Sequence, residues 1–386
     1  MSDRAFIPLA RPTLGAEEEQ AVARVLRSGW ITQGPEVERF EAEFAGFVGA
    51  PHAVAVSSGT AALHLALLAI GIGPGDEVVT VSHSFIATAN SIRYCGGVPV
   101  FVDIQPATFN IDPTLIEAAI TPRTRAILCV HQMGLPCDLQ AILAIARRRK
   151  LTVVEDAACA VGSEILWDGA WQRIGRPHGD IACFSFHPRK LLTTGDGGMV
   201  TTARQDWADA LRLLRWHGMS VPAHVRHAAN RVMNERYETL GWNYRLTDMQ
   251  AAIGREQLKR LPAMVTRRRA LAARYAAGLA GILELIPPAE PGWARTNWQS
   301  YCVRLAPGID RDGVMQTLLD LGIATRRGVM CAHREPAYGG DPVRSCAPLA
   351  HSEQAQDHGM VLPLYPDMRD SDQDSVITAL RQILSK

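Results

Sequence analysis

One lysine of this chain lies in a sequence context that suits covalent chemistry. The 386 residues include 40 lysines and arginines, of which four are lysines and 36 are arginines. Lys190 ends the run 183–190, just ahead of the glycine-rich turn 194–198. A desolvated lysine that loses its proton can form a Schiff base with an aldehyde, whereas a guanidinium stays charged. Lys190 is therefore a candidate to carry an aldehyde cofactor. The alternative is a strand-end lysine that points into water.

An acidic residue ends a second predicted strand upstream of this lysine. Residues 151–158 predict a buried strand with Asp156 at its carboxyl end, where open α/β sheets place ligand-binding groups. A carboxylate there could keep the ring nitrogen of pyridoxal phosphate protonated, so that the ring accepts electrons from a bond broken in the substrate. The alternative is an aspartate that caps the next helix.

A third pattern, nearer the start, predicts a helix terminus that could hold a phosphate. In residues 54–67, small side chains and Gly59 come directly before a run of alanines and leucines. The free N–H groups at the start of such a helix are a binding site for anions. The alternative is an ordinary serine or threonine cap.

Length, charge and cysteine usage exclude several classes of protein. A chain that is 47% hydrophobic and this long can form a large and a small domain, each with its own core. A net charge of +1 gives no electrostatic basis for binding nucleic acid or an anionic membrane. The start lacks the apolar segment of a signal peptide, and no apolar run reaches roughly 18 residues, which predicts a cytoplasmic protein. The eight cysteines lack paired CxxC spacing, so we expect neither a metal site nor disulfides.

Apolar runs alternate with helical patterns over most of the chain. Six segments predict short buried strands, at 77–81, 98–103, 126–130, 152–155, 181–186 and 199–202. Helices are predicted between them at 61–69, 87–94 and 139–149. This alternation predicts an α/β fold with a mostly parallel sheet that helices cover on both faces.

The last third of the chain has a different pattern. Residues 248–260 predict a helix that ends near Pro262, and an arginine-rich helix follows. The proline-rich segment 286–292 indicates a connection into a carboxyl-terminal domain. We predict a large cofactor-binding domain over 1–260, and a connecting helix with a small domain over 261–386. The small domain is predicted to contain a strand at 300–305 and helices at 312–321 and 371–384.

Four ordered segments resemble the DegT/DnrJ/EryC1/StrS family of sugar aminotransferases, which belongs to the fold-type I pyridoxal-phosphate enzymes. They are residues 29–37, 58–63, 155–158 and 240–248. The resemblance extends almost from end to end of the chain. It implies an α/β fold whose large domain has a mixed, mostly parallel sheet flanked by helices, with a smaller α+β domain at the carboxyl end. It also implies that pyridoxal 5'-phosphate, which alternates with its pyridoxamine form, is the cofactor.

The resemblance implies catalytic roles for two of the residues above. Lys190 would form the Schiff base and, once the substrate amine displaces it, act as the general acid and base. Asp156 would pair with the pyridine nitrogen. Relatives that use the cofactor for dehydration have histidine in place of this lysine, so Lys190 favours amino transfer.

The resemblance also assigns contacts around the cofactor. Residues that would hold its phosphate are Gly59, Thr60, Ala61 and Ser185. Phe85 would stack on the ring, although plain core packing would also explain a phenylalanine at this position.

Further matches concern the partner subunit and the substrate. Asn243 matches a family residue that reaches the phosphate of the neighbouring subunit's cofactor, which implies a homodimer with shared active sites. The alternative is a turn asparagine before a helix. His333, Arg326 and Arg327 match a stretch near the sugar, and the arginines would suit an anionic nucleotide diphosphate, with surface charge as the alternative. His187 is interpreted as packing at the strand end rather than as a cofactor contact.

The chain departs from the family pattern at two positions. Cys159 stands where the family often has a glutamine that contacts the phenolic oxygen of the cofactor, and a thiol is a weak donor. Asp196 stands where glutamate is frequent, which we expect only to shift the packing of the turn after Lys190.

These observations predict a ping-pong aminotransferase. An amino acid, by resemblance glutamate, would donate the amino group, and a keto-sugar, by resemblance a nucleotide-linked deoxyhexose, would accept it. A cyclitol or another keto-carbohydrate is an alternative acceptor. A non-catalytic sensor that binds pyridoxal phosphate is an alternative from another class. The joint presence of Lys190, Asp156 and Asn243 argues against the sensor.

Overall fold

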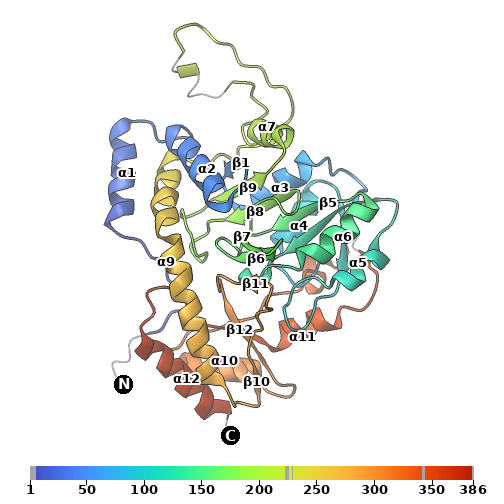
Figure 1. Ribbon diagram of the computed structural model, residues 1–386, viewed down its shortest axis with the longest axis vertical. Helices are drawn as coiled ribbons and strands as arrows, with labels where there is room; N and C mark the ends of the chain where they lie inside the picture. The colour runs from blue at the N-terminus through green and yellow to red at the C-terminus, as the bar shows by residue number, and fades with distance from the viewer. Residues whose placement is uncertain (1–5, 222–225, 228, 341–343, 385–386) are drawn as a thin grey trace.

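An eight-stranded mixed sheet forms the centre of the computed structural model, which describes residues 6–384 except 222–225, 228 and 341–343 (Figure 1). Its strands are β1 (His52–Val56), β2 (Glu77–Val81), β3 (Val98–Val102), β4 (Thr124–Val130), β5 (Thr152–Asp156), β8 (Ile181–Ser185), β9 (Gly198–Thr202) and β14 (Arg344–Ser345). They follow the order β1-β9-β8-β5-β4-β2-β3-β14. Neighbouring strands run parallel, except that β9 is antiparallel to both β1 and β8.

Helices cover both faces of this sheet, because its strands are apolar on both sides. Successive residues of β2 enter different clusters of buried side chains, with Val79 on one face and Val78 on the other. The cluster around Val79 includes residues of α2 (Pro35–Val48), α5 (Pro113–Ala119) and α6 (Leu139–Arg149). The cluster around Val78 includes residues of α3 (Gly59–Ala69), α4 (Ala87–Tyr94) and α7 (Gln205–Leu214). This architecture confirms the predicted fold class.

The predicted elements of the sheet and of the carboxyl-terminal part agree with the structure to within two residues at each end. The sequence analysis did not identify strands β1 and β14 of this sheet, and its prediction of a helix break at Pro262 is wrong. A single helix, α9 (Asp248–Leu279), runs through Pro262 without ending. Proline removes one helical hydrogen bond, but a continuous row of buried side chains on α9, including Leu261 and Val265, holds the helix together across this point.

Helix α9 extends along one side of the molecule and contacts α1 (Ala16–Ser28), α2 and α12 (Asp370–Leu384) (Figure 1). The carboxyl-terminal half of α9 packs into a second cluster of buried side chains. This cluster also contains residues of a four-stranded antiparallel sheet, whose strands follow the order β10-β12-β15-β13. These strands are β10 (Leu285–Ile286), β12 (Tyr301–Leu305), β13 (Arg326–Arg327) and β15 (Gly359–Leu362), and α10 (Arg311–Asp320) and α11 (Ala350–His358) lie beside them. The predicted boundary at residue 260 falls inside α9, so the division of the chain there stays a prediction.

A small antiparallel sheet lies between these two parts of the molecule (Figure 1). It consists of β6 (Glu164–Trp167), β7 (Ala170–Arg173) and β11 (Ala294–Arg295), in the order β11-β6-β7. Between α7 and α9 the described part of the chain also extends away from the sheet. In the part of the chain that the structure describes, no helix has the length and apolar character of a membrane span.

Candidate active site

Several predicted site residues lie where parallel strands end, at one edge of the large sheet. Asp156 is the last residue of β5 and pairs with Cys183 of the neighbouring β8. Ser185 is the last residue of β8. The carboxyl ends of neighbouring parallel strands lie at the same edge, which is where open α/β sheets bind ligands. The fold therefore brings both residues to one place although they are far apart in sequence.

The candidate lysine contacts the loop that follows Asp156. Nζ of Lys190 lies 3.0 Å from Sγ of Cys159, and both side chains are half-buried. The loop is held by Asn297, whose side-chain amide donates to the carbonyl oxygens of Cys159 and Val161, over 2.9 and 2.8 Å. The thiol at the position where the family often has glutamine is thus in direct contact with the Lys190 amine. Asn297 was not predicted, because no local sequence pattern connects it to this loop.

The carboxylate of Asp156 is held by a chain of buried hydroxyl groups. Oγ1 of Thr88 donates to Oδ2 of Asp156 over 2.7 Å, and the backbone N–H of Ala158 donates to Oδ1 over 3.2 Å. Oγ of Ser84 lies 2.7 Å from Oγ1 of Thr88. Because the proton of Thr88 goes to the carboxylate, Ser84 must donate to Thr88. The sequence analysis missed Thr88 and Ser84, and the only signal was their closeness to Phe85.

The helix terminus predicted to hold a phosphate packs directly against Ser185. Ser58 caps α3 by accepting a hydrogen bond from the N–H of Ala61 over 3.1 Å. A Cβ atom added to Gly59 would lie 2.7 Å from Cβ of Ser185, so only glycine permits this approach. Thr60 occupies the first turn of the helix, between these residues. The structure therefore brings together the whole predicted phosphate-binding set, with the free N–H groups of α3 beside the Ser185 hydroxyl.

Phe85 and Asn243 are both exposed in the single chain. Phe85 is 59% exposed, so core packing does not account for its position, and its stacking role stays a prediction. Asn243 forms an isolated antiparallel bridge with Trp216 and has an exposed side chain. Its predicted target is the cofactor of a second subunit, which one chain does not contain.

The predicted sugar-binding residues lie in the carboxyl-terminal part of the chain. The ring of His333 is held at both nitrogens, with Nδ1 2.6 Å from Oγ of Ser82 and Nε2 3.1 Å from Glu353. Ser82 directly follows β2, so His333 is tied to the edge of the sheet that carries the site. Arg326 and Arg327 form the short strand β13 and are exposed. Their role toward a substrate stays a prediction.

Two other histidines lie close to these residues. His187 is exposed, and its Nδ1 accepts a hydrogen bond from the N–H of Arg189 over 3.2 Å. His83 is fully buried between Ser82 and Ser84, and neither of its ring nitrogens has a hydrogen-bond partner among the described residues. Burial lowers the pKa of His83 to about 4, although the nearby Asp103 carboxylate acts in the opposite direction. The imidazole of His83 is therefore neutral at physiological pH.

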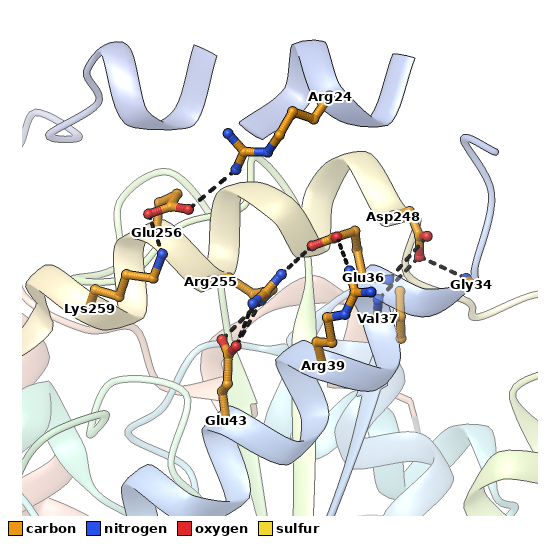
Figure 2. Close-up of polar contacts among 10 residues, drawn as sticks. All are labelled: Arg24, Gly34, Glu36, Val37, Arg39, Glu43, Asp248, Arg255, Glu256 and Lys259. Carbon is orange, nitrogen blue, oxygen red and sulfur yellow. Dashed lines mark hydrogen bonds and ion pairs between the residues drawn. The ribbon is translucent and has the colours of Figure 1, made fainter. Parts of the chain in front are cut away.

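Two of the segments that carry the family resemblance meet at Asp248 (Figure 2). This buried aspartate begins α9, and its carboxylate accepts hydrogen bonds from the backbone N–H groups of Gly34, Glu36 and Val37, over 2.7, 3.2 and 3.1 Å. These are free N–H groups at the start of α2, so Asp248 caps a helix distant in sequence. Figure 2 also shows Arg255 of α9 paired with two glutamates of α2. The segment that carries Asn243 is thereby fixed to the start of α2.

The geometry of this edge fits pyridoxal phosphate. It offers a half-buried amine, a buried carboxylate with lone pairs left after two hydrogen bonds, and a glycine-lined helix terminus for a phosphate. An amine, an acid for the ring nitrogen and an anion site are the groups that this cofactor requires. Fold and site together define a pyridoxal-phosphate enzyme of fold-type I.

Comparison with known proteins identifies the family. The model of the DegT/DnrJ/EryC1/StrS aminotransferase family matches residues 12–381, so the chain belongs to this family. It is 43% identical over 383 residues to the spore coat polysaccharide biosynthesis protein SpsC of Bacillus subtilis (strain 168), a match that covers 98% of this chain and 97% of SpsC. The family resemblance inferred from the sequence is confirmed.

Solved structures agree with this assignment. DesV of S. venezuelae, determined in complex with a ketimine intermediate, is 38% identical, covers 99% of this chain and 100% of its own, and has a TM-score of 0.90. DesI, determined in the presence of its TDP-sugar product, is 32% identical over 99% of this chain and 94% of its own, with a TM-score of 0.88. A Streptococcus pneumoniae protein described as a sugar aminotransferase, in its PLP form, is 27% identical over 99% of both chains, with a TM-score of 0.90. The chain is thus a pyridoxal-phosphate-dependent sugar aminotransferase.

Proposed function

We propose that this enzyme moves an amino group from L-glutamate to a nucleotide-linked keto-sugar, in active sites completed by a second copy of the chain. The observation that carries the proposal is the meeting of Lys190, Asp156 and the start of α3 at one sheet edge. The TDP-sugar product in the DesI structure supports a nucleotide sugar as the acceptor. The exposed arginines of β13 would suit its diphosphate.

Each residue of the site has a defined task in this proposal. Bound pyridoxal phosphate supplies the electron sink for the bond broken at the substrate carbon. Nζ of Lys190 would hold the aldehyde group of the cofactor, and the free amine would move the proton at the substrate carbon. Asp156 keeps the ring nitrogen protonated, and Thr88 orients its carboxylate. The N–H groups of α3, together with Ser185, hold the phosphate.

The amino donor can be tested by absorbance. Purified enzyme loaded with pyridoxal phosphate is mixed with L-glutamate, and we expect the absorbance of the lysine-bound cofactor to give way to that of the pyridoxamine form. The variant Lys190→Ala should lack the first absorbance and show no turnover. No change with glutamate in the unmodified enzyme would contradict the proposed donor. No change with any amino acid would favour a non-catalytic protein that binds the cofactor.

The acceptor is tested on the pyridoxamine form. A panel of nucleotide-linked keto-sugars is compared with free keto-sugars and keto-cyclitols, and return of the lysine-bound absorbance is measured. We expect the nucleotide-linked sugars to react at least about tenfold faster, because the free compounds lack the charged diphosphate. Equal or faster reaction of a cyclitol would refute the proposed acceptor class. A cytoplasmic location remains a prediction, to be tested by cell fractionation.

A further inference from the structure

We propose that His64 is a positioning residue, which links the phosphate-binding helix of one subunit to the asparagine that this subunit presents to its partner. This inference rests on the shared active site proposed above. It assigns a function to a buried histidine that has no part in the mechanism described so far.

Residues 242–244 form an extended segment whose side chains alternate in direction. Trp242 and Tyr244 are half-buried and pack against the cluster that contains α3, whereas Asn243 between them is exposed. Such alternation is typical of extended backbone. The segment is fixed by backbone hydrogen bonds, from the N–H of Trp242 to the carbonyl of Leu214 over 2.7 Å and from the N–H of Tyr244 to the carbonyl of Arg215 over 3.0 Å. The direction of Asn243 therefore depends on how its two aromatic neighbours pack.

His64 contacts both of these neighbours. Its Nδ1 lies 3.4 Å from the hydroxyl oxygen of Tyr244, and its ring centroid is 5.0 Å from that of Trp242, with the ring planes at 73°. His64 is only 4% exposed, and burial lowers its pKa, so the imidazole is neutral at physiological pH. A neutral ring suits both an edge-to-face aromatic contact and a hydrogen bond with a phenol.

The same tyrosine is tied to the phosphate-binding turn. His64 lies in the second turn of α3, the helix whose start forms the predicted phosphate site. In addition, the N–H of Ser57, just before that turn, donates to the carbonyl of Tyr244 over 2.8 Å. Tyr244 is thus held from the body of α3 and from the strand end that leads into it. A phosphate that orders this turn in one site also steadies the Asn243 that serves the other site.

Mixed dimers separate the effects of His64 on the two sites. One subunit carries Lys190→Ala and supplies Asn243, and the other carries Asn243→Ala and keeps Lys190. Only the second subunit's site can give the absorbance of a lysine-bound cofactor, so titration of the apo dimer with pyridoxal phosphate reports the affinity of that single site. In this control dimer we expect the affinity of the unmodified enzyme, which the Asn243→Ala homodimer should lose.

His64→Leu is then introduced into one subunit at a time. In the subunit that supplies Asn243, we expect this substitution to weaken pyridoxal-phosphate binding roughly tenfold. The reason is that the Asn243 amide, when it is no longer held in position, loses its hydrogen bond to the charged phosphate. In the other subunit we expect less than about a threefold change. His64→Asn keeps a polar atom at the position of Nδ1 and should restore most of the affinity. Tyr244→Phe, which removes only the hydroxyl, is a milder second variant that should act in the same direction.

Pyridoxal, which lacks the phosphate, distinguishes a misplaced Asn243 from a general loss of structure. A general loss of structure would weaken the binding of both compounds, whereas a misplaced Asn243 would weaken only the binding of pyridoxal phosphate. Its affinity should be equal in all of these dimers. Equal weakening from either subunit, weakening from neither, or parallel loss of pyridoxal binding would overturn the role of His64 and leave the shared site intact. A control dimer that binds no better than the Asn243→Ala homodimer would overturn the shared site itself, and the inference with it.

Discussion

The hydroxyl of Thr88 gives the sharpest test of how the site is built. Thr88 is 1% exposed, and its Oγ1 lies 2.7 Å from Oδ2 of Asp156 and 2.7 Å from Oγ of Ser84. Thr88→Val replaces this hydroxyl with a methyl group of similar size. The packing of α4 is therefore retained while one oxygen of the Asp156 carboxylate loses its buried donor.

The loss of cofactor affinity and of kcat/KM that we expect for Thr88→Val follows from the charge and burial of the Asp156 carboxylate. A hydrogen bond to a charged group contributes about 1.5–3 kcal/mol, and Asp156, at 5% exposure, has little access to water as a substitute donor. Asp156 is the residue assigned to the cofactor ring, so a carboxylate that is no longer oriented should bind the cofactor less well. We expect the affinity for pyridoxal phosphate and the value of kcat/KM to fall by at least about tenfold each.

The assay combines cofactor titration with initial rates, and thermal melting of the apo protein serves as the folding control. Thr88→Ser retains the hydroxyl and should stay within about threefold of the unmodified enzyme in both measurements. Ser84→Ala removes the group that donates to Thr88 and should give an intermediate loss. If Thr88→Val matched Thr88→Ser in affinity and turnover, the hydroxyl chain would not orient Asp156, and the reasoning would be refuted.

Three further predictions concern the surroundings of the site. Asp248→Ala leaves three N–H groups at the start of α2 without their acceptor and should lower the free energy of unfolding by about 2 kcal/mol in urea denaturation. Asp248→Asn keeps one acceptor oxygen and should lower the free energy of unfolding by roughly half as much. Gly59→Ala forces a Cβ atom against Ser185 and should weaken cofactor binding about tenfold. The control Gly46→Ala adds a Cβ atom in open space on α2 and should raise the free energy of unfolding by about 0.5–1 kcal/mol. Equal effects of the two substitutions on cofactor binding would contradict the close approach of Gly59 to Ser185. Burial lowers the pKa of His83 to about 4 in the folded protein, against the ordinary histidine pKa of 6.5, so the unfolded chain takes up the proton first as the pH falls through this window. The unmodified protein should therefore lose about 3 kcal/mol more stability than His83→Gln between pH 7 and pH 4 in denaturation curves, and parallel pH profiles would exclude this role of His83.

The sequence predicted the elements of the sheet well because their signals are local. A buried parallel strand such as β2 is a continuous apolar run, and glycines mark the turns that follow α3 and α4. The continuity of α9 through Pro262 could not be predicted, since it depends on packing against elements far away in the chain. A proline in a helical pattern indicates a break unless such packing overrides it.

The candidate site was predictable only in part, for the same physical reason. Lys190, Asp156 and Gly59 each have a recognisable sequence context, and the structure brings their segments to one edge. Thr88 reaches Asp156 across 68 positions of sequence, and Asn297 reaches Cys159 across 138, so no window of sequence contains both partners. The surroundings of Asn243 in an active site depend on a second chain and lie beyond any single-chain pattern.

The near absence of lysine has a practical consequence for labelling. Lys150 and Lys259 are exposed, Lys190 is half-buried, and the fourth lysine is the terminal residue, so the surface offers an added aldehyde very few competing amines. Guanidinium groups do not react in this way. Treatment of the loaded enzyme with borohydride should therefore mark a single proteolytic fragment, which makes this chain well suited to counting occupied sites by mass.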